Sequence, residues 1–542
     1  MAGAVDLDSR PVADAAGPGG LVPGGPSKPG AGGARRASAA TVGLVLALAT
    51  LSVLARLPFV VRPLSPDEGG FLMVAAQWGP GASLYGNYWV DRPPLLITLF
   101  SLAHHLGGLA DQGSGVGGAV ALRLVGAACV GTSVLLAAAL ARAVVRLDRG
   151  AGHVSARLSR FVVVGAAATA ATFLVSPMFG AGEVDGEILA VPFVLAGLTA
   201  AFRAYASVRS AGRSGAGSAA WWATAGVLAV AAGGVKQNML EVFVVVGVLL
   251  VATSRRSPRA AIGAAAAFGA GVVAGAAALL GWAAWHGTPP AGIWDAVVTF
   301  RFQAAAVIAH GAPGTARARG LGVAGAFVTT GALGVVVAAF VPGRRGRSAG
   351  RPGALLAATA AVLVWEGIGV VGGGSYWLHY LIGTVPGLVL AAVTVALRGR
   401  RRALGAVVAY AAVVSTVAVT TTAFAAAGAP SASTTVEHYL ATHARAGDTG
   451  VVGFGDPALL EAAHLPSPYP QLWSLPVRVR DPHLSDLNAL LEGPRRPTWI
   501  VVDGDSLASW GIDASLAQPV LEREYRQVRT VDDWHVYHVR PS

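Results

Sequence analysis

The chain has 542 residues, of which 54% are hydrophobic and 13% are charged, and its mean hydropathy is +0.59. Soluble globular proteins usually carry about 25% charged residues, so this composition excludes an ordinary soluble protein. Apolar runs of about 20 residues, long enough to cross a bilayer core of about 30 Å, recur along the chain. The formal net charge is +12, but the basic residues lie in short clusters between apolar runs. That pattern is typical of cytoplasmic loops and excludes a nucleic-acid-binding surface.

The amino-terminal part, residues 1–37, is rich in Gly, Pro and Ala and has no apolar period, which predicts a disordered cytoplasmic tail. Arg35 and Arg36 precede an apolar stretch at about 39–61. This stretch is too long for a signal-peptide core and lacks a cleavage site, so it predicts an uncleaved membrane helix. Arginines before the helix place the amino terminus in the cytoplasm and residues 62–92 outside.

The side of every later loop depends on residues 93–110, a short apolar segment that begins with two prolines. If this segment spanned the membrane, the later arginine clusters would lie outside, against the positive-inside rule. If it lies along the interface, five clusters fall inside instead. They are Arg146–Arg160, Arg203–Arg213, Arg255–Arg259, Arg344–Arg351 and Arg398–Arg402. We therefore expect a juxtamembrane helix at 93–110.

The expected fold is an all-α polytopic membrane domain over residues 38–430, followed by a small extracytoplasmic α/β domain over 431–542. The second domain has ordinary charge, strand-like runs at 450–454 and 498–502, and a helix near 435–446. Residues 286–318 are expected to form a long outer loop, and Arg317 and Arg319 at its end are the exception to the positive-inside rule. Length and hydropathy predict eleven spans: about 39–61, 119–146, 160–179, 188–206, 219–235, 238–253, 260–285, 319–341, 353–371, 376–397 and 403–426.

The loop after the first span, residues 62–94, carries much of the polarity near the membrane. It contains the adjacent acids Asp67 and Glu68, an aromatic run, and the tetrad Asp91-Arg92-Pro93-Pro94. Asp67 and Glu68 could simply cap the following helix, whose amino end favours carboxylates. Asp91 and Arg92 could be a structural ion pair.

Further ionisable groups fall on the same expected side of the membrane. They are Glu183, Asp185 and Glu187 in one short loop, Lys236 and Gln237 at a helix junction, and His379 and Tyr380 before a late span. The acids could be solvated loop residues, Lys236 could extend to the interface, and His379 and Tyr380 could be interfacial anchors. Ionisable groups near apolar depth are costly and usually face a cavity or a partner. Their concentration at one leaflet therefore indicates a functional site.

These residue types suit group transfer from a donor with an anionic leaving group to a hydroxyl acceptor. A carboxylate can take the acceptor's proton, and cationic side chains can stabilise a departing phosphate. A groove at membrane level suits a lipid-linked donor, because the lipid tail can stay in the bilayer. No Walker-type Gly-rich loop for a nucleotide donor occurs in the sequence.

The first loop resembles that of the C-type (GT-C) integral-membrane glycosyltransferases, in particular the protein O-mannosyltransferase and lipid A aminoarabinose transferase families. The matching residues are Ser65-Pro-Asp-Glu68 and Asp91-Arg-Pro-Pro-Leu95. The second acidic loop, the Lys236-Gln237 pair and His379-Tyr380 are weaker matches. The resemblance covers roughly residues 40 to 395.

The resemblance implies a polyprenyl-phosphate sugar donor and inverting transfer to a protein, glycolipid or wall glycan at the outer face of the plasma membrane. Asp67 would be the base, and Glu68 with one acid of the second loop would position the acceptor or a metal. We assign Asp185 to that place and leave Glu183 and Glu187 open. Arg92 and Lys236 would contact phosphate, and the remaining substrate-binding candidates are Asp91, Gln237, His379 and Tyr380.

The resemblance leaves a divalent cation open, because some relatives use one and others do not. Cys129 is the only cysteine, which excludes a cysteine-based metal site. The main alternative function is a membrane transporter or lipid flippase, which would place ionisable groups near the bilayer midplane on broken helices and inverted repeats. A non-catalytic scaffold, in which residues 431–542 bind a partner, is a third reading. Placement of the polar groups at one end of the spans favours the enzyme.

Overall fold

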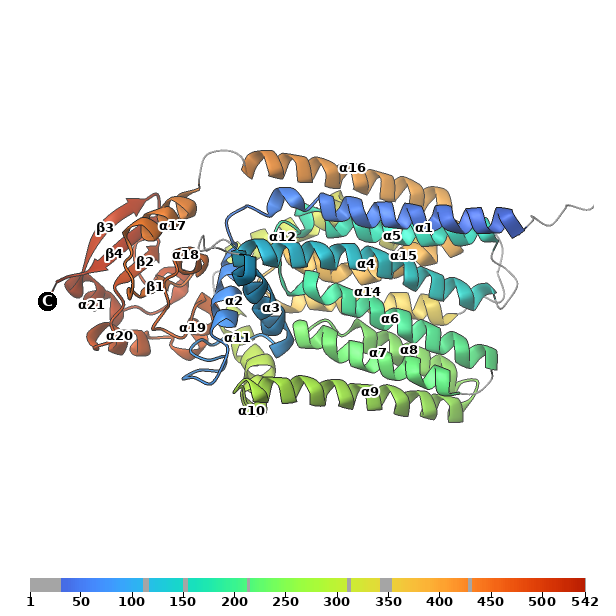
Figure 1. Cartoon of the computed structure of the whole chain (residues 1–542), viewed down its shortest axis with the longest axis horizontal. Coiled ribbons are helices and arrows are strands. Elements are labelled where there is room, and N and C mark those ends of the chain that lie inside the picture. The colour runs from blue at the N-terminus through green and yellow to red at the C-terminus, as the bar shows by residue number, and fades with distance from the viewer. Residues whose placement is uncertain are drawn as a thin grey trace, which may run out of the picture.

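The computed structural model describes residues 31–110, 117–149, 155–211, 215–309, 313–341, 353–426 and 431–541. Most of the tail predicted at 1–37 lies outside these residues. The first helix, α1 (Ala31–Leu54), begins within the predicted tail range. A long helical bundle and a carboxy-terminal domain lie end to end along the longest axis of the molecule (Figure 1).

The bundle confirms the polytopic α-helical class. Among the described residues, ten helices are long and apolar enough to cross a membrane, and nine of them coincide with predicted spans. A bent pair, Thr315–Thr329 with Ala332–Phe340 at 64°, accounts for a tenth predicted span. These segments are α1, α4 (Gly117–Arg149), α5 (Ala156–Leu174), α6 (Gly186–Ala211), α7 (Ala216–Val235), α9 (Pro258–Trp285), α12 (Pro313–Thr329) with α13 (Ala332–Phe340), α14 (Gly353–Gly372), the 3₁₀ turn Leu378–Thr384 with α15 (Val385–Leu397), and α16 (Arg401–Ala426). The chain is a multi-pass membrane protein.

The remaining predicted span, 238–253, is the shorter helix α8 (Glu241–Ser254). Its 14 residues extend about 21 Å at a rise of 1.5 Å per residue, less than the thickness of a bilayer core. The stretch before it, Lys236 to Leu240, is not helical, so α8 does not cross the bilayer as one regular helix.

The prediction of an outer loop at 286–318 is wrong. Most of this segment forms α10 (Pro290–Trp294), a π-helical turn (Asp295–Thr299), α11 (Phe300–Ala309) and the start of α12. Ala296, Phe300 and Ala304 are buried at a spacing of four residues, which gives the segment one apolar helical face. Although Pro290–Ile308 is apolar enough for a span, α10 and α11 lie at the end of the bundle next to the carboxy-terminal domain (Figure 1).

The two ends of the bundle differ in charge. The short apolar helix α3 (Pro94–Ala110) lies beside α2 (Pro66–Ala76) at the end nearest the carboxy-terminal domain, as an interfacial helix would (Figure 1). The connections that carry Arg255–Arg259 and Arg398–Arg402 lie at the opposite end (Figure 1). By the positive-inside rule the arginine-rich end is predicted to face the cytoplasm.

The carboxy-terminal domain contains a four-stranded sheet in the order β1-β2-β4-β3. The helix predicted near 435–446 is α17 (Ala432–His443), and the two predicted strands are β1 (Gly450–Gly453) and β2 (Trp499–Asp503), which pair in parallel. The antiparallel hairpin of β3 (Tyr525–Val531) and β4 (Trp534–Val539) was not predicted. The shorter helices are α18 (Ala458–Ala462), α19 (Ser474–Arg480), α20 (Ser485–Glu492) and α21 (Ala517–Glu524).

Two glycines of α2 bring the first loop into close contact with this domain. A Cβ on Gly69 would lie 2.4 Å from Ala458 Cα, and one on Gly70 would lie 2.2 Å from the Trp473 ring. The rest of the loop adds polar contacts, including the Trp89 amide, which donates to the Pro470 carbonyl at 3.0 Å. The first loop therefore joins the bundle to the carboxy-terminal domain.

Replacing Gly69 with Ala should weaken this contact, because the added Cβ has no space against Ala458. Overpacking of this kind costs about 1–3 kcal/mol. Gly247→Ala is the matched control, since a Cβ there meets nothing within 4 Å and favours the helix by up to about 1 kcal/mol. Thermal unfolding of the two variants measures the difference, and equal melting temperatures would contradict the close packing.

Candidate active site

A cavity of about 910 Å³ lies where the bundle meets the carboxy-terminal domain. Its volume lies within the range of about 300–1,000 Å³ typical of small-molecule sites. Seven of the eleven predicted site residues line it: Asp67, Asp91, Arg92, Glu183, Asp185, His379 and Tyr380. The other four, Glu68, Glu187, Lys236 and Gln237, do not line it. Three further arginines, Arg301, Arg319 and Arg478, line it without having been predicted.

Asp67 lines the cavity, and no other described side chain pairs with its carboxylate. It lies in the first turn of α2, two residues after the helix cap Ser65. The amino end of a helix favours a negative charge. Within the described part of the chain, its carboxylate makes neither a hydrogen bond nor an ion pair. Asp67 is therefore available to a ligand.

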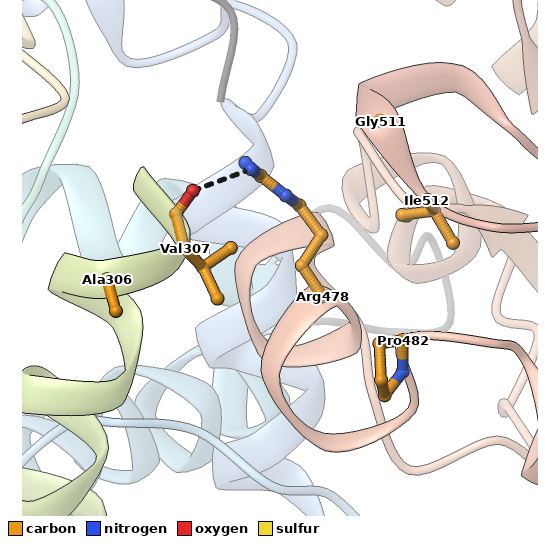
Figure 2. A pocket seen from close by; sticks show the side chains of 6 residues that line it. All are labelled: Ala306, Val307, Arg478, Pro482, Gly511 and Ile512. Atoms are coloured by element: carbon orange, nitrogen blue, oxygen red, sulfur yellow. Dashed lines mark hydrogen bonds between the residues drawn. The ribbon is translucent and has the colours of Figure 1, made fainter. Parts of the chain in front are cut away.

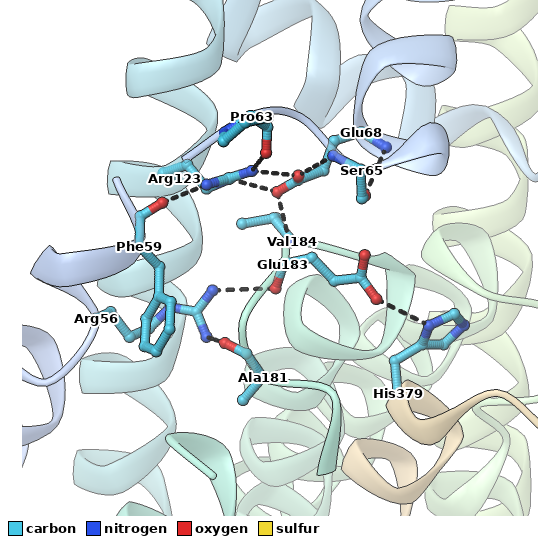
Figure 3. A network of polar contacts seen from close by, with 10 residues as sticks. All are labelled: Arg56, Phe59, Pro63, Ser65, Glu68, Arg123, Ala181, Glu183, Val184 and His379. Atoms are coloured by element: carbon cyan, nitrogen blue, oxygen red, sulfur yellow. Dashed lines mark hydrogen bonds and ion pairs between the residues drawn. The ribbon is translucent and has the colours of Figure 1, made fainter. Parts of the chain in front are cut away.

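Glu68, by contrast, is completely buried in a structural network (Figure 3). It forms a capping box with Ser65, and its two oxygens receive the Arg123 guanidinium in a bidentate ion pair. One of these oxygens also accepts the Val184 amide at 2.8 Å. Since both oxygens are occupied, Glu68 is a positioning residue in this structure, in contrast to the direct role predicted for it.

Two arginines from membrane helices hold the two acidic loops together (Figure 3). Arg123 of α4 donates to the carbonyls of Phe59 and Pro63, on either side of the turn that leads into α2. Arg56, two residues beyond the end of α1 in the same membrane segment, donates to the carbonyls of Ala181 and Glu183 in the second loop. Neither arginine was predicted, although a single arginine inside an apolar span is itself a signal of a buried partner.

The second loop and the turn before α15 bring three metal-ligating side chains together. His379 Nδ1 lies 3.4 Å from Glu183 Oε1 and 3.7 Å from Asp185 Oδ2. Asp185 Oδ1 accepts the Ile188 amide at 3.1 Å, which caps α6. Burial, together with the nearby Glu187, raises the pKa of Asp185 to about 8. The hydrogen bond from His379 and its charge hold the pKa of Glu183 below its usual value, although burial opposes them.

These three side chains are suited to hold a divalent cation. Each offers one ligand atom, and the three atoms lie within 4.8 Å of one another. Asp185 Oδ2 is buried and has no hydrogen-bond partner among the described residues. Two carboxylates and an imidazole are ligands that Mn²⁺ and Zn²⁺ accept. The residues present therefore fit a divalent cation.

A second cluster places two cations around one acid. Asp91 is buried, and Arg92 and Arg301 each contact a different oxygen of its carboxylate, Arg92 at 2.6 Å. These two arginines hold the pKa of Asp91 below its usual value, although burial opposes them. The cluster keeps one excess positive charge beside the cavity, which suits an anionic ligand such as phosphate.

The remaining predicted residues support this cluster from outside the cavity. Lys236 forms an ion pair with Glu187, and its Nζ lies 5.1 Å from the centre of the Tyr380 ring. The Gln237 amide, turned so that its oxygen faces Arg301, accepts two hydrogen bonds of 2.8 Å from that guanidinium. Glu187 is thus the acid of the second loop that is removed from the cavity, whereas Glu183 and Asp185 line it.

Known proteins provide only distant comparisons. No family model and no curated protein matches the chain. Among solved structures, the chain is similar to the Archaeoglobus fulgidus oligosaccharyltransferase in complex with Zn and sulfate, at 14% identity and a TM-score of 0.45 over 88% of this chain and 71% of that one. It is also similar to ArnT from Cupriavidus metallidurans bound to undecaprenyl phosphate, at 14% identity and a TM-score of 0.42 over 92% of this chain and 99% of that one. Apo ArnT from the same organism shows 15% identity and a TM-score of 0.39, over 93% of this chain and the whole of that one.

Both neighbours are GT-C glycosyltransferases, the class named by the resemblance of the first loop. The likeness is distant, because the identities are 14–15% and the TM-scores are below 0.5.

Arg123→Gln should lower the free energy of unfolding by about 3–5 kcal/mol, because it leaves the Glu68 carboxylate buried without a counter-charge. Adding Glu68→Gln should recover part of that loss, since the double variant buries no unpaired charge. A double-mutant cycle measured by denaturant unfolding tests the pair. Additive effects of the two substitutions would contradict a coupled ion pair.

Purified protein should bind Mn²⁺, and Asp185→Asn should weaken that binding at least about tenfold by removing a carboxylate ligand. Electron paramagnetic resonance of Mn²⁺ measures free and bound metal without any enzyme assay. Asp505→Asn is the control, because Asp505 is exposed and does not line the cavity. Mn²⁺ binding of equal strength in both variants would exclude the Glu183–Asp185–His379 site.

Proposed function

We propose that the protein transfers a sugar from a polyprenyl-phosphate carrier to an acceptor hydroxyl at the extracytoplasmic face of the plasma membrane. One observation carries this proposal: the unpaired carboxylate of Asp67 shares a cavity with the Arg92–Arg301 cation pair. The charges of Asp91 and Asp67 raise the pKa of Arg92 against opposing burial, so Asp67 and Arg92 interact electrostatically. The cavity thus combines a base with a binding site for an anionic leaving group.

In the proposed reaction, Asp67 accepts the proton of the acceptor hydroxyl as its oxygen attacks the anomeric carbon of the donor sugar. The new glycosidic C–O bond forms as the bond from the anomeric carbon to the phosphate oxygen breaks. The electron pair of the broken bond stays on the phosphate, where Arg92 and Arg301 stabilise the charge. A single displacement of this kind inverts the anomeric carbon, and polyprenyl phosphate and glycosylated acceptor leave.

The position of the cations suits a lipid-linked donor. Arg319, a further arginine at the cavity, stacks 4.5 Å over the Trp377 ring. Trp377 and Leu378 are 44% and 40% exposed at the start of a membrane segment, so they offer apolar surface to a polyprenyl tail. We propose that the phosphate lies between the arginines while the tail remains in the bilayer beside these residues.

Glu183, Asp185 and His379 would hold a divalent cation at the same cavity. A bound cation supplies a fixed positive charge that attracts phosphate or an acceptor oxygen. The roles of Asp67 and the arginines are the same whether or not a cation is bound. Asp67 accepts the proton of the acceptor hydroxyl, and the arginines bind the phosphate leaving group.

Asp67→Asn should reduce sugar transfer at least about 100-fold, because the amide cannot accept the acceptor proton. The fold should lose no more than about 1 kcal/mol, because Asp67 makes no hydrogen bond or ion pair among the described residues and gives up only its interaction with the amino end of α2. Transfer from a radiolabelled polyprenyl-phosphate sugar by protein in nanodiscs measures the effect. Near-normal transfer in the variant would remove Asp67 as the base. Movement of the donor across the bilayer without transfer by the wild type would favour a flippase.

Arg301→Gln should weaken binding of polyprenyl phosphate about tenfold or more, because a charge-assisted hydrogen bond is worth about 1.5–3 kcal/mol. Asp91 keeps Arg92 as its counter-charge in this variant, which protects the fold. Arg317→Gln removes the same charge from an exposed position outside the cavity. Binding measured by microscale thermophoresis should separate the two variants, and equal affinities would argue against a phosphate site at Arg301.

A further inference from the structure

The sheet of the carboxy-terminal domain opens onto the cavity at one edge. Strands β1 and β2 are parallel neighbours, paired from Gly450 with Trp499 to Gly453 with Val502, so their carboxyl ends lie at the same edge. Phe454, Gly455 and Asp456 follow β1, Asp503 ends β2, and all four line the cavity. Ligands of open α/β sheets bind in the crevice outside the carboxyl ends of parallel strands. The sheet edge therefore has the position of a binding site.

Aromatic rings flank the two acids of this edge. Trp534 begins β4 and pairs in register with Asp503. Trp473 precedes α19 and packs 5.3 Å from the Phe71 ring of α2. Both tryptophans line the cavity. A large flat ring beside a carboxylate offers an apolar face and a strong acceptor to the same ligand.

The two carboxylates make few contacts with the rest of the fold. Asp456 Oδ1 accepts only the Ala458 amide, at 3.2 Å. Asp503 makes no side-chain hydrogen bond, and neither acid has a cationic partner among the described residues. Burial and the neighbouring acids, Asp503 among them, raise the pKa of Asp456 to about 6. Most of the cationic residues of the cavity, Arg92, Arg301 and Arg319, belong to the bundle instead.

We infer that this sheet edge, formed by Asp456, Asp503, Trp473 and Trp534, is the acceptor subsite and that it selects an uncharged saccharide. Hydroxyl groups donate hydrogen bonds to carboxylates, and the C–H face of a pyranose ring packs on a tryptophan ring. A phosphate- or uronate-bearing acceptor would meet like charge at this wall, which disfavours it. This inference rests on the proposed glycosyl transfer, whose donor occupies the opposite, arginine-lined wall.

A second pocket adjoins the main cavity and gives an acceptor of more than one sugar room to continue. It is about 370 Å³ in volume and shares Arg478 and Gly511 with the main cavity. Figure 2 shows Arg478 reaching across to α11, where it donates to the Val307 carbonyl at 3.0 Å. The acceptor chain would leave the site between α11 and the carboxy-terminal domain.

The test measures saccharide binding by the full chain in nanodiscs on an array of neutral, uronic-acid and sulfated oligosaccharides. Wild-type protein should bind at least one neutral oligosaccharide and should bind the anionic ones more weakly. Asp456→Asn with Asp503→Asn should weaken that binding at least tenfold. Trp534→Ala should weaken it likewise, whereas Trp534→Phe, which keeps a flat ring, should retain most of it.

Asp505→Asn is the control, because Asp505 is an exposed acid two residues beyond Asp503 and does not line the cavity. Decaprenyl phosphate binding, measured on the same samples, should not change in the Asp456/Asp503 variant. The inference is overturned if no neutral oligosaccharide binds, if anionic ones bind more tightly, or if the variant binds like the control. If the wild type does not bind decaprenyl phosphate, the proposed function is rejected instead.

Discussion

The buried ion pair between Arg123 and Glu68 is the interaction on which the rest of the site depends. Their side chains are 3% and 0% exposed, so neither charge is stabilised by water. Each is compensated by the other, by the capping box of α2 and by backbone groups of both acidic loops. Removing one partner of such a pair is much more costly than the pair is stabilising. The pair therefore fixes Asp67 on α2 relative to Glu183 and Asp185.

The first loop extends this constraint to the second domain. Gly69 and Gly70 follow Asp67 and Glu68 directly, and their missing side chains let α18 and Trp473 pack on α2. The same short helix thus presents the candidate base to the cavity and positions the wall formed by the sheet edge. The bundle lines the cavity with Arg92, Arg301 and Arg319 and with four acids, and the carboxy-terminal domain adds Asp456, Asp503 and Arg478. The excess positive charge of Arg92 and Arg301 over Asp91 suits an anionic substrate, and the acids of the sheet edge, which have no cationic partner among the described residues, suit a neutral one.

Hydropathy was sufficient to predict ten of the eleven expected spans, because burial in a bilayer requires long apolar helices. Of the predicted residues, those that line the candidate cavity include Asp67, Arg92 and His379, which the sequence places beside membrane segments. Arg301 was missed because its helix is short and was taken for part of a loop. The β3–β4 hairpin was missed because strand residues such as Arg526 and Arg529 are exposed and polar. Glu68 is part of the Ser65-Pro-Asp-Glu68 motif, which does not tell whether its side chain contacts substrate. Its contacts with Arg123 show that it is a positioning residue.

A structure of the full chain in nanodiscs with bound polyprenyl phosphate would test the proposed donor site most directly. We expect density for the phosphate between Arg92 and Arg301 in the cavity beside Asp67, with the tail leaving along Trp377 and Leu378. Phosphate bound at the arginine-rich end of the bundle, or inside the bundle away from this cavity, would contradict a donor site at the first loop.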